Sequence, residues 1–73
     1  MRQFNTVLEY IGKMWIISCE ELRITLEGAS QDALIERLKL AIQEIAEVEL
    51  GYKGDIQIVI SMRDRIEEIR AAS

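Results

Sequence analysis

Polar and hydrophobic residues alternate at the start of the chain. Residues 3–10 repeat with a period of two and are rich in β-branched and aromatic side chains, which predicts a first β-strand. The alternation does not decide which face of this strand is buried, because Val7 competes with Thr6 for the inward position. The strand is therefore predicted, and its orientation is left open.

Two further strands are predicted before residue 30. Gly12 lies in a short hairpin turn over residues 11–13, where glycine is free to adopt positive φ. Residues 14–19 form a short apolar run, which indicates a strand that is largely buried on both faces. Residues 22–26 alternate again, so we expect a third strand with one solvated face.

The middle of the chain has the periodicity of an amphipathic helix. Apolar residues recur at i, i+3, i+4 and i+7 from Ala33 onwards, Ser30 is a favourable N-cap, and Gly51 is a favourable C-cap. The stripe that we expect to cover a sheet comprises Leu34, Ile35, Leu38, Ala41, Ile42, Ile45 and Val48. The pattern thus predicts one helix over residues 31–50.

The last part of the chain predicts one strand and a short helix. Residues 55–62 alternate and form the fourth strand. Asp64 and Glu67 have the spacing of a capping box, so Ile66 and Ile69 are expected to dock a short C-terminal helix.

The resulting order, β-β-β-α-β, predicts a two-layer α+β domain spanning residues 1–73, with one helix on one face of the sheet. Val7, Met14, Ile16 and Val59 cannot all lie beneath a single helix. An open apolar sheet face in so small a domain favours a homo-oligomer, a dimer or a tetramer.

Composition excludes most chemistry. The 73 residues include no histidine and one cysteine, so we expect no enzyme, no metal site and no cofactor. Cys19 follows an apolar run, which is typical of an inert structural thiol. No apolar stretch approaches the roughly 20 residues of a membrane span, and a cytoplasmic location is expected. A net charge of −4 disfavours direct nucleic-acid binding, including RNA on the sheet, and favours a basic protein partner.

Several residues have two interpretations. Trp15 is either a core aromatic or an interface anchor, and Glu20–Glu21 are either a solvated corner or an acidic contact. Leu40 and Leu50 are either single exposed leucines or, together with Tyr52, the rim of an oligomer contact. The candidate partner contacts are Trp15, Glu20, Glu21 and Arg23, and the candidate oligomer contacts are Met14, Ile16, Leu40, Leu50 and Tyr52.

The segment from residue 15 to residue 42 resembles the HicB-like antitoxin superfamily, in particular its short stand-alone domains. The matching features are a hairpin ending in Met14–Trp15, the group Cys19–Glu20–Glu21, the helix start Gly28, Ser30, Gln31 and Asp32, and the helix pattern Leu34, Leu38, Ala41 and Ile42. The family usually has Pro-Gly after the two acids, where this chain has Leu22–Arg23–Ile24.

The resemblance implies a partial ribonuclease-H-like sheet without nuclease residues. It also implies an antitoxin that binds a small basic, mRNA-cleaving toxin of the HicA type and blocks its catalytic histidine. The alternative is an orphan HicB-like domain that forms homo-oligomers and has no toxin partner. We expect no helix-turn-helix or ribbon-helix-helix DNA-binding domain in this chain.

Overall fold

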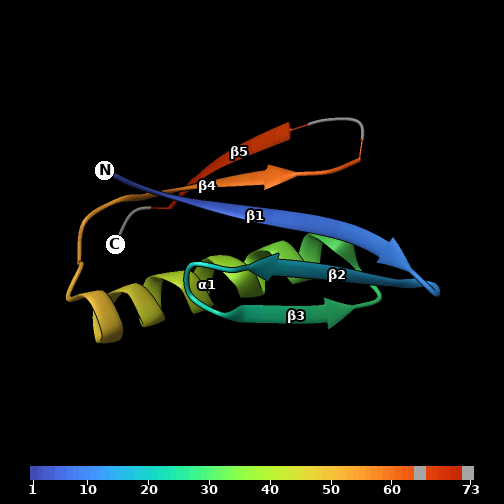
Figure 1. Cartoon of the computed structure of the whole chain (residues 1–73), viewed down its shortest axis with the longest axis horizontal. Coiled ribbons are helices and arrows are strands. Elements are labelled where there is room, and N and C mark those ends of the chain that lie inside the picture. The colour runs from blue at the N-terminus through green and yellow to red at the C-terminus, as the bar shows by residue number, and fades with distance from the viewer. Residues whose placement is uncertain (64–65, 72–73) are drawn as a thin grey trace.

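One helix packs against one face of a five-stranded sheet in the computed structural model, which describes residues 1–63 and 66–71 (Figure 1). The elements in chain order are β1 (Arg2–Ile11), β2 (Met14–Cys19), β3 (Ile24–Gly28), α1 (Gln31–Leu50), β4 (Ile56–Ser61) and β5 (Ile66–Ala71). The predicted two-layer α+β class is therefore confirmed, and the order gains a fifth strand.

The strand order in the sheet is β3-β2-β1-β4-β5. β1 and β4 are parallel neighbours, and every other neighbouring pair is antiparallel. A parallel pair cannot be joined by a tight turn and needs a crossover. α1 provides that crossover between β3 and β4 while it covers the sheet, lying closest to β2 and β3.

The helix has the predicted ends. The Ser30 hydroxyl accepts a hydrogen bond from the Ala33 N–H at 3.3 Å, and Gly51 closes the helix in the left-handed conformation at φ 65°. The buried residues are Leu34, Ile35, Leu38, Ile42 and Ala46. The prediction for Val48 was wrong, because Val48 lies about 200° around the helix from Ala46 and is 78% exposed.

The structure decides the orientation of β1. Phe4, Thr6 and Leu8 point toward α1 and are buried, whereas Val7 is exposed on the other face. Thr6 can occupy the core because its hydroxyl donates to the Val59 carbonyl at 3.1 Å, which removes the cost of burying an unpaired polar group.

β2 is buried on one face only, so the prediction of a strand covered on both faces was wrong. Ile17 and Cys19 are fully buried, whereas Met14 is exposed and Ile16 is half-buried. The reason is that the single helix covers one side of the sheet, and the apolar composition of β2 supplies hydrophobic side chains to both sides.

The third strand begins two residues later than predicted, at Ile24 rather than Leu22. Arg23 adopts φ 55°, a left-handed conformation that interrupts the extended chain. Leu22 is nevertheless buried, so it closes the core from the corner that links β2 to β3.

The predicted C-terminal helix is wrong, since residues 66–71 form β5 against β4. Six residues make a poor isolated helix because nucleation is costly. The strand instead satisfies the outer edge of β4 and places Ala71 in the core. Asp64, the proposed cap, lies outside the described residues.

Candidate functional site

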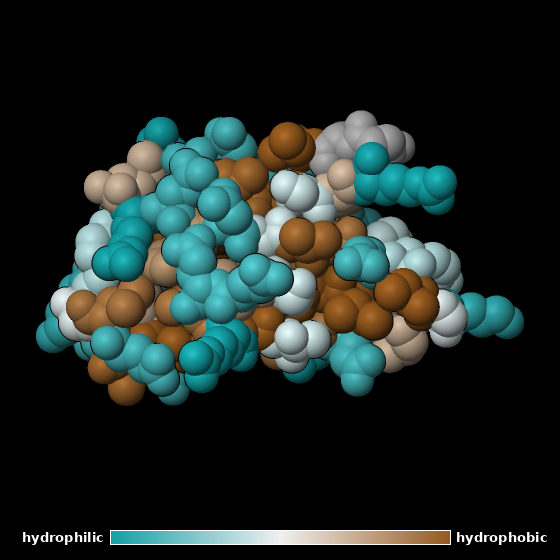
Figure 2. Space-filling view, viewed as in Figure 1, coloured by the Kyte–Doolittle hydropathy of each residue, from teal (hydrophilic) through white to brown (hydrophobic). Residues whose placement is uncertain are grey.

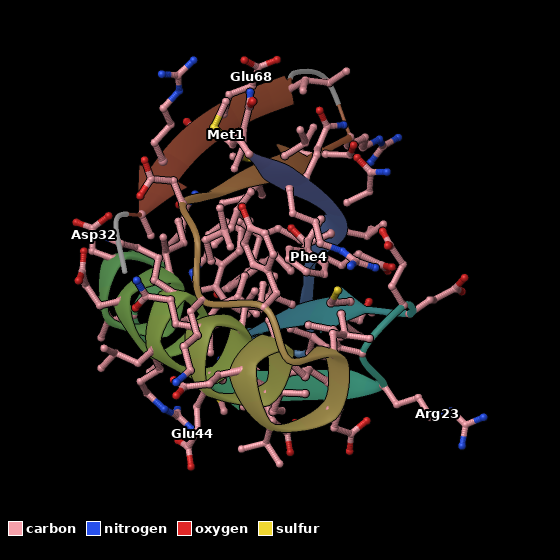
Figure 3. The ribbon with its side chains drawn as sticks, turned by 90° about the vertical axis from the view of Figure 1, so that its left-hand side faces the viewer. Met1, Phe4, Arg23, Asp32, Glu44 and Glu68 are labelled. Carbon is pink, nitrogen blue, oxygen red and sulfur yellow. The ribbon has the colours of Figure 1, made fainter. Side chains whose placement is uncertain are left out.

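The sheet face turned away from α1 is not covered by any element of the described chain, and we call it the open face. Figure 3 shows α1 on one side of the molecule, with Phe4 between the layers. The apolar band on the open face consists of Val7, Ile11, Met14, Ile16, Val59 and Ile66. Figure 2 looks onto this face and shows hydrophobic side chains running across its centre toward the hairpin end. Val7, Met14, Ile16 and Val59 thus lie together away from the helix, as their pattern predicted.

Two carboxylates lie on either side of Ile16 in the apolar band. Glu9 pairs with Ile16, and Ile16 pairs with Glu27, so the three residues form one row across β1, β2 and β3. Neither carboxylate takes part in an ion pair within the described ranges 1–63 and 66–71. An apolar residue between two free negative charges is suited to a surface that is both apolar and basic.

The opposite end of the open face is polar and internally bonded. Gln57 donates to the Glu68 carboxylate at 2.9 Å, and Gln3 donates to the Asn5 side-chain carbonyl at 3.1 Å. These four polar side chains are therefore paired with one another at this end of the open face.

The predicted acidic corner links β2 to β3 and is exposed. Glu20, Glu21 and Arg23 all lie at the surface, and Figure 3 shows Arg23 pointing away from the body of the molecule. The Glu21 carboxylate accepts from the Asn5 backbone N–H at 3.4 Å. Glu21 is thus held against β1, and Glu20 and Arg23 are the outermost charges of the corner.

Trp15 does not belong to this corner. It sits at the start of β2, five residues before Glu20, which corresponds to about 17 Å of extended strand. The indole is half-buried against the core and faces Tyr10, with ring centroids 4.7 Å apart. The core interpretation of Trp15 therefore holds for the side of the indole that packs inward, and the interface interpretation stays a prediction for its exposed part.

The predicted oligomer contacts divide between the two sides of the molecule. Met14 and Ile16 lie on the open face, whereas Leu40 and Tyr52 line a shallow hollow of about 590 Å³ on the helix side. Tyr52 is fixed there by donating its hydroxyl to the Asp55 carbonyl. Leu50 is partly exposed at the end of α1. These five residues therefore do not lie on one surface of the chain.

Cys19 is a free, fully buried thiol. Burial raises the pKa of the Cys19 thiol, the Leu22 backbone N–H opposes that rise, and the Glu21 carboxylate adds to it. A protonated thiol without solvent access is a poor nucleophile and a poor metal ligand. Among the residues that the structure describes, no group of three or more His, Cys, Asp or Glu converges to hold a metal ion.

Comparison with protein-family models, curated proteins and solved structures finds no match to this chain. α1, the helix of the described chain, is too polar to cross a membrane.

Sequence reasoning missed three residues of the open face, Glu9, Glu27 and Ile66, and the exposed Tyr10 on the core side of the hairpin. Ile66 was assigned to a helix, so its place beside the apolar band could not be anticipated. The alternation in residues 3–10 does put Glu9 on the same face as Val7, and this signal was available. Glu27 joins them only through the register of β2 and β3.

Proposed function

We propose that this chain is a non-catalytic protein-binding domain of the HicB-like type, which binds a small basic toxin of the HicA type on its open face. The observation that carries the proposal is the apolar band with Glu9 and Glu27 on either side of Ile16. Exposed apolar patches rimmed by charge are typical of protein contacts. A positively charged partner would gain both burial and charge complementarity there.

The backbone at Arg23 also supports the HicB-like part of the proposal. The family usually has Pro-Gly after the two acids, which places glycine at the position of Arg23. Arg23 has φ 55°, a conformation that glycine adopts freely and that is unfavourable for arginine. The corner therefore keeps the shape of a glycine turn although the glycine is absent.

The sheet is compatible with the same family. The meander β1–β2–β3, the helical crossover and the parallel β1–β4 pair fit the partial ribonuclease-H-like sheet that the resemblance implies. β5 is an addition at the far edge and leaves that arrangement unchanged.

The test is capture of a partner followed by an activity assay. The chain is immobilised and exposed to lysate of its own source cell, and any small basic protein recovered at near-equal stoichiometry is purified and tested for RNA cleavage. We expect the wild-type chain to inhibit that cleavage. Ile16→Lys and the double variant Glu9→Lys/Glu27→Lys should bind the basic protein at least tenfold more weakly than wild type. Val48→Lys should bind it with the affinity of wild type.

Two results would overturn the proposal. One is the recovery of no basic partner at any salt concentration. The other is a partner whose affinity is the same for wild type and Ile16→Lys, since the open face would then not be its binding surface. Val48→Lys is the matched control because Val48 is an exposed apolar residue on α1, away from the open face.

The second candidate function is a homo-oligomeric HicB-like domain without a toxin. It is favoured by a different feature, the unpaired edge at the end of β1. A chain that recovers only copies of itself from lysate would support this alternative.

A further inference from the structure

β1 is longer than the strand that covers its outer edge. It pairs with β2 as far as Ile11 but with β4 only as far as Val7. Beyond that point, no strand of the described chain pairs with the edge of β1 that faces β4. Figure 1 shows the β1–β2 hairpin projecting past the end of β4. A hollow of about 960 Å³ follows this step, and Tyr10, Trp15 and Met62 are among its lining residues. An unpaired strand edge is a template for another strand.

The turn geometry determines which main-chain groups face the free edge. Gly12 and Lys13 both have positive φ, at 58° and 68°, as a two-residue type I′ turn requires. Ile11 and Met14 flank that turn as a hydrogen-bonded pair. Because hydrogen-bonded and non-bonded positions alternate along an antiparallel ladder, the Tyr10 N–H and C=O point away from β2, toward the free edge.

The geometry points to a homodimer in which this free edge pairs antiparallel with the same edge of a second copy. Residues directly opposite each other in a sheet share a face. The core-side residues of β1 have even numbers. Only registers that place even-numbered residues opposite even-numbered residues therefore keep the core sides of both copies on the same face of the sheet. A register centred on Glu9 would set the two Glu9 carboxylates opposite each other, which is unfavourable. It would also place Ile11 of the second copy opposite Val7, a position that Ser61 of β4 already occupies. Both effects exclude that register.

A register centred on Tyr10 fits the part of the β1 edge that β4 does not cover. It places Leu8 opposite Gly12 of the second copy, so the paired segment stops just before Val7, the last residue of β1 that pairs with β4. The two Tyr10 residues then exchange reciprocal N–H···O=C bonds, and their rings meet beside the two Trp15 rings. Tyr10 is 57% exposed in the single chain, although it lies on the core side of β1. The dimer adds a second aromatic ring, the Tyr10 of the other copy, to the contact with Trp15 that this side chain already makes.

The two-fold axis of this dimer is perpendicular to the sheet, so both open faces lie on the same side and meet at the β1 edges. The pairing uses the strand edge and the core-side residue Tyr10, and it leaves Ile16 and Glu27 uncovered. The dimer is therefore independent of the proposed binding of a basic protein, and either can fail while the other holds.

Sedimentation velocity on the full chain, from micromolar to millimolar concentration, tests the dimer. We expect a monomer–dimer equilibrium whose dissociation constant rises at least tenfold in Tyr10→Lys, because two ammonium groups would then lie opposite each other. Tyr10→Phe should keep the affinity within about threefold, since the backbone bonds and ring contact remain. Val48→Lys, the matched control, should leave it unchanged.

Disulfide trapping tests the register. Residues of a hydrogen-bonded antiparallel pair have Cα atoms about 5.5 Å apart, within reach of a disulfide. Mild oxidation should therefore link Tyr10→Cys into a dimer but not Glu9→Cys, and wild type should stay unlinked because Cys19 is buried. Three results would overturn the inference. The first is a wild-type chain that stays monomeric at millimolar concentration. The second is a dimer that persists in Tyr10→Lys but dissociates in Leu40→Lys or Ile16→Lys, and the third is equal disulfide trapping of the two cysteine variants.

Discussion

Tyr10 and Trp15 occupy paired positions on the β1–β2 hairpin, with ring centroids 4.7 Å apart and ring planes inclined by 50°. This arrangement is neither a flat stack nor a perpendicular contact, and it covers the outer side of a half-buried indole. Trp15 packs against the core on its other side. The pair therefore extends the core side of the sheet to the end of the β1–β2 hairpin.

The coupling between these rings can be measured. We expect Trp15→Ala to lower the free energy of unfolding by about 2–3 kcal/mol and Tyr10→Ala by about 1 kcal/mol, because the indole buries more surface. The double variant should lose about 0.5–1.5 kcal/mol less than the sum. Urea unfolding of the four proteins at one low concentration measures this coupling, and strict additivity would contradict the contact.

Two leucines on α1 provide a matched test of the helix orientation. Leu38 is fully buried under the sheet, whereas Leu40 is 67% exposed. Leu38→Ala should lower the free energy of unfolding by about 2–5 kcal/mol, because it removes buried surface and leaves a cavity. Leu40→Ala should change it by less than about 0.5 kcal/mol. Chemical denaturation measures both, and a loss for Leu40 equal to that for Leu38 would show that α1 presents another face to the sheet.

Arg23 provides a test of backbone strain. A non-glycine residue in the left-handed region costs about 1–2 kcal/mol, and Arg23 has φ 55°. Arg23→Gly removes that cost but adds freedom to the unfolded chain, so we expect a net gain in stability of up to about 1 kcal/mol. Arg23→Ala, which removes the same side chain and keeps the Cβ atom, should give no gain. A stabilisation of equal size in the alanine variant would attribute the effect to the guanidinium charge instead.

The elements with strong local signals could be predicted from the sequence. α1 has its capping hydroxyl at Ser30 and its glycine at Gly51, and both ends are where those residues placed them. Residues 66–71 carried a misleading local signal, because Ile66 and Ile69 have helical spacing. What makes them a strand is the need to pair the outer edge of β4, and this need is not visible within the segment itself.

The open face could be predicted only in part. Four apolar residues exceeded what one helix can cover, and this count was enough to indicate an exposed face. The row of Glu9, Ile16 and Glu27 depends on the register of three strands, which the sequence does not specify before they pair. Trp15 was grouped with the acidic corner because it is close to it in sequence, and the extended geometry of β2 separates them.

The buried thiol predicts a pH dependence of stability. Burial is the main cause of the raised pKa of Cys19 in the folded chain, whereas the unfolded chain has an ordinary thiol pKa of about 8.5. Above that pH the unfolded state has lost a proton that the folded state retains. The contribution of the protonated Cys19 thiol to the free energy of unfolding is therefore complete below about pH 8.5. It declines as the pH rises toward the pKa of Cys19 in the folded chain, with a slope of at most about 1.4 kcal/mol per pH unit.

Comparison with Cys19→Ala isolates this effect, because tyrosine and lysine titrations are common to both proteins. The difference in unfolding free energy between wild type and Cys19→Ala should be constant from pH 6 to about pH 8 and should shrink above pH 8.5. Urea denaturation under reducing conditions, in steps of half a pH unit, measures it. A difference that stays constant to pH 10 would mean that the thiol ionises equally in both states, and a difference that grows would mean that the folded chain stabilises the thiolate.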